Sequence, residues 1–412
     1  MMLFTDSEFR TLVEPVLGCT VADRNDAVAS IALSCIIEPG DGLAGQLADL
    51  LSPSAFLVHL IGRSSAGTIA DTLGSETVLD LETDFNRRWQ TIWDNALERW
   101  LPRLSKNELV SAIEWMKAAA SGIATGHSLV IRGSAEYPSG LEDLGRHAPP
   151  ALWCLGDRNL LAERATISVV GTRNASQYGL ETAADLAVVA GQAGIVSVSG
   201  GAFGIDAAIH GAALALNAPT VAVMAGGLAN LYPKSNISML TSIANESLLF
   251  SESAPWVTPA KFRFLQRNRL IAALGKGTIV VEAGATSGAL STANRALELG
   301  RQVAVVPGPI NSSRSVGCHD FANSYAGLVQ VLARPQDVLA LAGLATNATA
   351  TPDGLGRLEK RALDCFTGTF IEAWEVQRLA GLTVRETQIA LGSLELLGLV
   401  ERRGTAYRGS TG

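Results

Sequence analysis

Five short apolar runs, each rich in β-branched residues, recur between residues 167 and 308 of this 412-residue chain. They read ISVVG (167–171), IVSVS (195–199), TVAVM (220–224), TIVVEA (278–283) and QVAVVPG (302–308). Apolar residues occupy both parities of these runs, which predicts strands buried on both faces, as in a parallel sheet. Ala- and Leu-rich stretches such as GLETAADLAVVAGQAG and STANRALELG alternate with them. We therefore expect a doubly wound α/β domain.

Further regions lie on both sides of this pattern. Residues 1–120 carry apolar residues at helical spacing and predict a helical N-terminal domain. Within it, IIEPGDGLAGQLADLL (36–51) resembles a helix-hairpin-helix element, whose turn amides can face a phosphate; a plain helical hairpin is the alternative. We place the α/β domain at 121–344. Its first part, residues 121–165, is rich in turn signals and predicts a connector. A flexible linker (345–356) then precedes a tail (357–412) of three helices and a hairpin, which is typical of a winged helix.

Composition limits the classes of function. The net charge of −7 argues mildly against nucleic acid as a partner, but positive charge can be concentrated in one groove. The N-terminus shows no secretory signal and the apolar runs are too short to span a bilayer, so we expect a cytoplasmic protein without a membrane partner. The five cysteines are scattered and lack zinc-ligand spacing, which predicts no metal site.

A glycine turn, SGGAFGID (199–206), follows the second predicted strand and opens a helix. Backbone amides at such a helix start favour an anion, and Gly200 and Gly201 would let a phosphate approach the backbone. The spacing is GGxxG rather than GxGxxG, and the chain has no GxxxxGK[ST] motif, so neither a dinucleotide cofactor nor P-loop ATP hydrolysis is expected. A purely structural turn is the alternative.

Positive charge is concentrated in KFRFLQRNRLIAAL (261–274), which holds four cations and two phenylalanines in its first nine residues and no acid. Cations follow phosphates, and aromatic rings stack on unpaired bases, so this stretch predicts contact with single-stranded nucleic acid. The alternative is a solvated basic helix start with buried phenylalanines.

These motifs, together with GTRNASQYG, GGLANLYPKSN, VVEAGATSGALSTANRALELGR and VAVVPGPINSSRSVGCHDFANSYA, resemble the DNA-processing protein A family (DprA, also called Smf) in order and spacing over about 130–340. The resemblance implies a Rossmann-like domain that binds single-stranded DNA. It also implies that the protein protects incoming or exposed single strands, loads RecA recombinase on them in transformation and recombination, and forms a homodimer. No cofactor is implied.

The resemblance assigns DNA contacts to particular residues. Arg173 would meet a phosphate, or alternatively pin its own loop. A phosphate cradle would comprise Ser199, Gly200, Gly201, Phe203 and Gly204. Lys261 and Arg263 would neutralise backbone charge, and Phe264 would stack on a base. The R-N-R signature comprises Arg267, Asn268 and Arg269, of which the last two are as easily ties between loop and sheet. A second phosphate site would comprise Thr286, Ser287 and Gly288.

Three titratable residues near these loops could suggest an enzyme. We interpret Asp206 as an acid that stabilises the start of its helix and His210 as a packed helix residue. Glu282 ends a buried strand, where it could hold Arg173 or Arg269. We therefore predict no catalytic residue. A nucleotide-processing phosphoribohydrolase is the rival, but PGPINSSRSVG lacks the glutamate of that family's P-G-G-x-G-T-x-x-E loop.

Overall fold

The structure is a computed structural model that describes residues 11–344 and 355–409, apart from residues 12, 18–19, 105–106, 108, 112–113, 115–126 and 162–163. The chain divides into two compact units, residues 1–344 and 345–412. The boundary predicted near residue 120 therefore falls inside the first unit. The linker predicted at 345–356 lies outside the described residues except for its last two positions, and so do most of residues 105–120 at the end of the predicted helical N-terminal domain.

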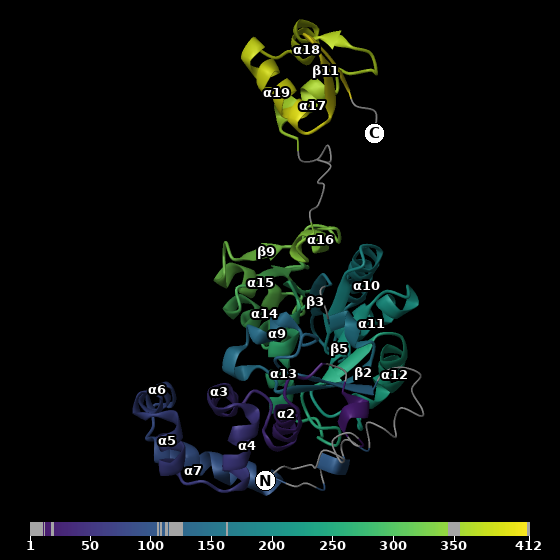
Figure 1. Cartoon of the computed structure of the whole chain (residues 1–412). Helices are drawn as coiled ribbons and strands as arrows, with labels where there is room; N and C mark the ends of the chain where they lie inside the picture. Colours follow the sequence, from purple (N-terminus) through teal and green to yellow (C-terminus); the bar gives the residue numbers. More distant parts are fainter. Residues whose placement is uncertain are drawn as a thin grey trace. The chain divides into compact units, whose positions relative to one another are not determined.

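A nine-stranded sheet lies at the centre of the first unit (Figure 1), in the order β1-β2-β6-β5-β4-β3-β7-β8-β9. The strands are β1 (His127–Ile131), β2 (Ala151–Gly156), β3 (Thr166–Val170), β4 (Val196–Ser199), β5 (Thr220–Val223), β6 (Leu248–Ser251), β7 (Gly277–Val280), β8 (Gln302–Val305) and β9 (Val329–Val331). The strands from β6 to β9 in this order run parallel, whereas β1 and β2 join antiparallel at one edge. The predicted Rossmann-like, mostly parallel α/β fold is confirmed.

All five strands predicted from the apolar runs are present, as β3, β4, β5, β7 and β8. Every residue of β3, β4, β5 and β7 is buried, which explains why apolar residues occupy both parities. The interpretation of 121–165 as a connector is wrong, because β1 and β2 lie within it. β2 starts directly after Pro149 and Pro150, so the turn signal of the prolines hid a fully buried strand.

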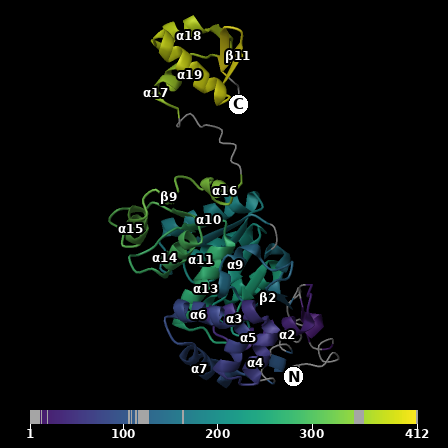
Figure 2. The same ribbon diagram turned by 60° about the vertical axis from the view of Figure 1, so that its left-hand side comes forward.

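Helices cover both faces of the sheet (Figures 1 and 2). One face packs against α9 (Ser139–Glu142), α13 (Lys261–Leu274), α14 (Gly288–Glu298) and α15 (Val316–Ser324). The other face packs against α10 (Gln177–Gln192), α11 (Ile205–Ala215) and α16 (Asp337–Leu341), and α12 (Ile237–Glu246) continues this layer over β2, β5 and β6. The carboxyl ends of the parallel strands are therefore bordered by loops rather than covered by these helices.

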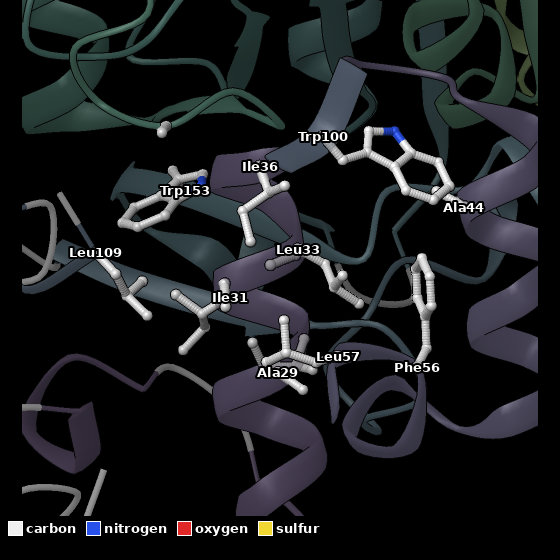
Figure 3. Packing of buried hydrophobic residues seen from close by; sticks show 14 of the residues in the cluster. Ala29, Ile31, Leu33, Ile36, Ala44, Phe56, Leu57, Trp100, Leu109 and Trp153 are labelled. Carbon is white, nitrogen blue, oxygen red and sulfur yellow. The ribbon is translucent and has the colours of Figure 1, made fainter. Parts of the chain in front are cut away.

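The N-terminal helices extend the core of the sheet rather than forming a separate one. They are α2 (Arg24–Ile36), α3 (Gly42–Leu51), α4 (Pro53–Ile61), α5 (Ala66–Leu73), α6 (Ser75–Phe85) and α7 (Trp89–Trp100). Figure 3 shows Leu33, Phe56 and Trp100 converging from α2, α4 and α7, with Trp153 of β2 nearby. The Phe56 and Trp100 rings meet edge to face with centroids 5.5 Å apart. Trp153 Nε1 donates to Ser34 Oγ of α2 over 3.2 Å, so the sheet edge and α2 share one buried interface.

The Pro-Gly-Asp-Gly turn between α2 and α3 packs against the α/β region. His147 Nδ1 lies 2.9 Å from the Gly40 carbonyl oxygen. A Cβ at Gly42 would come within 2.6 Å of His147 Cε1, and one at Gly45 would meet the Arg146 backbone. These glycines therefore permit close contact within the protein. A phosphate contact by this turn stays a prediction.

The second unit contains α17 (Arg357–Leu363), β10 (Ile371–Glu372), α18 (Ala373–Ala380), α19 (Val384–Leu396), β11 (Val400–Arg403) and β12 (Ala406–Gly409), with strand order β10-β12-β11. Three helices and a terminal hairpin are the elements predicted for this tail. They enclose a core of their own that includes Val376, Leu391 and Leu394. In the part of the chain that the structure describes, no single helix is long and apolar enough to cross a membrane; α3 and α4 reach that length only together, across a bend of 112°.

Candidate nucleic-acid interface

The order of the strands reverses beside β3. The chain adds β4, β5 and β6 on one side of β3, and α13 then brings it back to β7 on the other side. Ligands of open α/β sheets bind outside the carboxyl ends of the strands at such a point. A cleft of about 930 Å³ opens there, lined by the loops after β3 and β7 and by the first residues of α13 and α14. We call it the switch-point cleft.

Two cations and two aromatic rings meet at this cleft. Arg173, in the loop after β3, and Lys261, the first residue of α13, are both exposed and line it. Neither forms an ion pair with any residue that the structure describes. The Arg173 guanidinium carbon lies 5.0 Å from the centroid of the Phe264 ring, and the Tyr232 ring meets Phe264 edge to face at 5.9 Å. Positive charge and apolar ring surface are therefore available side by side.

The start of α14 adds hydrogen-bond donors to the same cleft. Thr286, Ser287 and Gly288 line it, and the first turn of α14 carries no acidic residue. Ser287 caps the helix by accepting from the Ala289 N–H over 3.4 Å, and Asn268 Nδ2 donates to the Gly288 carbonyl over 3.2 Å. The positive end of the helix dipole favours an anion at this position.

The glycine turn after β4 is filled by the protein itself. A Cβ at Gly200 would come within 2.5 Å of the Arg267 guanidinium carbon, and one at Gly204 within 2.9 Å of the Arg173 carbonyl carbon. Ser199 Oγ donates to the Val169 carbonyl over 2.7 Å. Asp206 accepts from the Ala202 N–H over 3.3 Å, which places a carboxylate where the sequence predicted a phosphate. The glycines of this turn therefore clear space for Arg267 and the loop after β3.

Other members of the predicted cradle differ in their access to solvent. Gly201 is buried with φ of +67°, a conformation that glycine adopts without strain. Phe203 is 42% exposed, but it does not line the switch-point cleft, whereas the neighbouring Ala202 does. A phosphate contact by the Ser199–Gly204 turn stays a prediction.

Arg267 holds two strand ends together. Its side chain is buried, and Nη1 donates to the Gly200 and Val223 carbonyls over 2.8 and 2.5 Å. Burial lowers the pKa of Arg267 to about 10, although the charge of Asp206 opposes the shift. Burial also raises the pKa of Asp206, and the charge of Arg267 counteracts this. The structure thus uses this arginine to join the ends of β4 and β5 behind the cleft.

The remaining arginines of α13 face away from the switch-point cleft. Arg269 Nη2 lies 2.5 Å from Glu252 Oε2, and both side chains are buried. Arg263 binds Glu38 through two bonds, Nη2 to Oε1 at 2.6 Å and Nε to Oε2 at 3.1 Å. Of the four cations in KFRFLQRNR, Lys261 is the exposed one, and it has no ionic partner among the described residues.

Glu282 and His210 have internal partners. Glu282 accepts from the Ser176 N–H over 2.8 Å and from its hydroxyl over 2.5 Å, so the expectation that it holds Arg173 or Arg269 is wrong. His210 Nδ1 lies 2.7 Å from Thr220 Oγ1, whose hydrogen goes to the Ser197 carbonyl, so Nδ1 carries the imidazole proton. Burial, aided by the charge of Arg267, lowers the pKa of His210 to about 3, and the ring is neutral at pH 7.

Tyr232 was not singled out from the sequence, although it lines the cleft and is 44% exposed. The sequence signal is its place in LANLYPKSN, the loop after β5, because the loops that follow parallel strands lie at one edge of the sheet. An aromatic residue in such a loop is a candidate for base stacking.

Comparison with known proteins agrees with this architecture. The sequence model of the family "DNA recombination-mediator protein A" matches residues 128–341, which include every predicted contact residue from Arg173 to Gly288. The chain belongs to this family.

Individual relatives extend the match. The putative DNA processing protein DprA of Mycobacterium tuberculosis is 42% identical over 272 residues, which are 64% of this chain and 69% of the relative. The DNA processing protein DprA of Streptococcus pneumoniae is 42% identical over 205 residues, covering 50% of this chain and 70% of the relative. The crystal structure of the Streptococcus pneumoniae protein superposes with a TM-score of 0.57 at 29% identity, covering 77% of this chain and 97% of that one. This member of the DNA-processing family therefore shares its fold with a solved relative.

Proposed function

We propose that the chain binds single-stranded DNA in the switch-point cleft. The observation that carries the proposal is the meeting of Arg173, Lys261, the Phe264–Tyr232 ring pair and the start of α14 around one opening of about 930 Å³. The cations and the helix start match phosphates, and the rings match unpaired bases. Stacking tolerates any base, so we expect binding with little sequence preference.

A more specific role is suggested by membership of the family. We propose that the protein protects incoming or exposed single strands and hands them to RecA recombinase in transformation and recombination, acting as a homodimer. Membership of a recombination-mediator family supports this role. We also propose that it catalyses no reaction. Glu282 supports this, because it is buried beneath the loop after β3 and both its oxygens accept hydrogen bonds from Ser176.

Fluorescence anisotropy of an oligo-dT across a salt series tests the proposal. We expect tight binding. The logarithm of the association constant should fall linearly with the logarithm of the salt concentration, by about 0.7 for each phosphate that the protein neutralises. Arg173→Glu and Lys261→Glu each place an anion at the cleft, so both should weaken binding about tenfold or more at fixed salt. Lys276→Glu is the matched control, because this exposed lysine precedes β7 and lies at the opposite edge of the sheet.

Equal loss of affinity in all three variants would mean that net charge alone matters, and unchanged affinity for Arg173→Glu and Lys261→Glu would remove the cleft from the proposal. AMP serves as a comparison ligand. Release of free base from AMP, abolished in Glu282→Gln, would instead support a phosphoribohydrolase.

A further inference from the structure

A second group of cations lies on the other side of α13. Arg263 and Arg103 both bind the carboxylate of Glu38, the residue that follows α2 by two positions. Arg103 Nη2 and Arg263 Nη2 each lie 2.6 Å from Glu38 Oε1. One anion therefore serves two guanidinium groups, which leaves a net positive charge.

The carboxylate is held in its charged form. Burial opposes ionisation, but the hydrogen bond from Arg263 and the charges of Arg103 and Arg263 outweigh it and lower the pKa of Glu38. A guanidinium that binds a carboxylate through two parallel bonds presents the geometry that also fits a phosphate. Glu38 thus occupies a position whose surroundings suit a phosphate equally well.

This position opens into a groove of about 300 Å³. Its lining includes Glu38, Arg103, Trp256, Thr258 and Arg263, and we call it the Arg103 groove. The Trp256 ring is half-buried, and Arg103 keeps 42% of its side-chain surface exposed. An aromatic ring and an exposed guanidinium in the lining of one groove are the combination that binds a base and its phosphate.

The Arg103 groove and the switch-point cleft meet at one segment of chain. Val257 and Thr258 line the groove, whereas Pro259, Ala260 and Lys261 line the cleft. Phe262, between Lys261 and Arg263, is 50% exposed, with the Arg263 guanidinium carbon 5.0 Å from its ring centroid. A single strand that leaves the cleft over the start of α13 would therefore enter the groove, because the protein residues that line the two openings are consecutive in the chain.

We propose that the Arg103 groove is a second phosphate subsite for the same single strand, and that the Glu38 carboxylate occupies the phosphate position in the free protein. The proposal rests on the single-stranded DNA binding proposed above. Bound phosphate would take over Arg103 and Arg263 from Glu38, so Glu38 acts as a built-in competitor. Strands confined to the cleft would not meet this competition.

The test compares oligo-dT of about 6 and about 20 nucleotides, because only the longer strand can fill both sites. Glu38→Gln keeps the shape of the side chain and removes the competing charge. We expect it to raise the ratio of long-strand to short-strand affinity about threefold and to steepen the long-strand salt slope by about 0.7, as one added phosphate contact would. Arg103→Ala should lower the same ratio. Glu298→Gln is the control for net charge, because it frees Arg295 from an exposed pair at the far end of α14.

The outcomes separate the two proposals. If the wild-type protein binds both lengths but Glu38→Gln leaves the ratio unchanged or lowers it, the Arg103 groove is no DNA site, while the cleft stands. If the wild-type protein binds neither length, the proposed function fails and the subsite fails with it. Should Glu38→Gln unfold, which a thermal melt detects, Arg103→Ala decides: an unchanged ratio overturns the subsite.

Discussion

At the scale of single residues, the glycines of the turn after β4 serve packing within the protein. Gly204 has φ of +72°, a conformation that strains any other residue, and it lies against the backbone of Thr172 and Arg173. Seven residues later, Gly211 sits inside α11 with open space where a Cβ would project. A side chain is therefore excluded at Gly204, the cap of α11, but has room at Gly211 inside the same helix.

This contrast gives a prediction about stability. Gly204→Ala should lower the free energy of unfolding by about 2–4 kcal/mol, because the new Cβ meets backbone atoms that cannot move aside and the backbone conformation is strained. Gly211→Ala should instead raise it by about 0.5–1 kcal/mol, since alanine is the better helix former. Urea denaturation of both variants measures the difference. Equal stabilities would show that the loop after β3 moves aside at little cost in free energy.

At the scale of elements, α13 shows what the sequence could predict and what it could not. The parity of apolar residues predicted the central strands, because a strand buried on both faces leaves a local signature. The spacing of cations and rings likewise marked α13 as part of the site. Which cations are free was not readable, because the partner of Arg263 is Glu38, 225 residues earlier in the chain. Ion pairs formed by folding leave no pattern in a short stretch of sequence.

Two residues of α13, Arg267 and Lys261, provide a matched test of the distinction between cations bound within the protein and cations that are free. Arg267→Ala would leave the Gly200 and Val223 carbonyls without their donor and Asp206 without its neighbouring charge, so the free energy of unfolding should fall by about 3–5 kcal/mol. Lys261→Ala should change stability by less than about 0.5 kcal/mol, because the side chain is exposed. It should nevertheless reduce the salt slope of DNA binding by about 0.7.

Chemical denaturation and anisotropy on the same two samples check both halves. A stable Arg267→Ala protein that has lost DNA binding would reverse the assignment, because Arg267 would then act on DNA rather than on the strand ends. A strongly destabilised Lys261→Ala protein would mean that the start of α13 depends on a contact that the described residues do not show.

At the scale of the whole molecule, the binding residues and the C-terminal unit are separable. Every residue of the switch-point cleft and of the Arg103 groove lies in the unit of residues 1–344. The unit of residues 345–412 has its own core. Its hairpin carries Arg402, Arg403 and Arg408. Arg408 is paired with Glu401 at 2.6 Å, and Arg402 lies 4.0 Å from Glu395. Its α19 exposes the apolar Val384 and Ile389.

These features predict that the C-terminal unit contributes little to single-strand affinity. A chain ending at residue 344 should bind oligo-dT within about twofold of the full chain, because its phosphate contacts are intact. The double variant Arg402→Glu, Arg403→Glu in the full chain tests the same point without truncation. If both retain affinity, the exposed apolar side chains of Val384 and Ile389 favour a protein as the partner of this unit. A tenfold loss in both would instead place DNA on the hairpin, and the single strand would then have to contact both units at once.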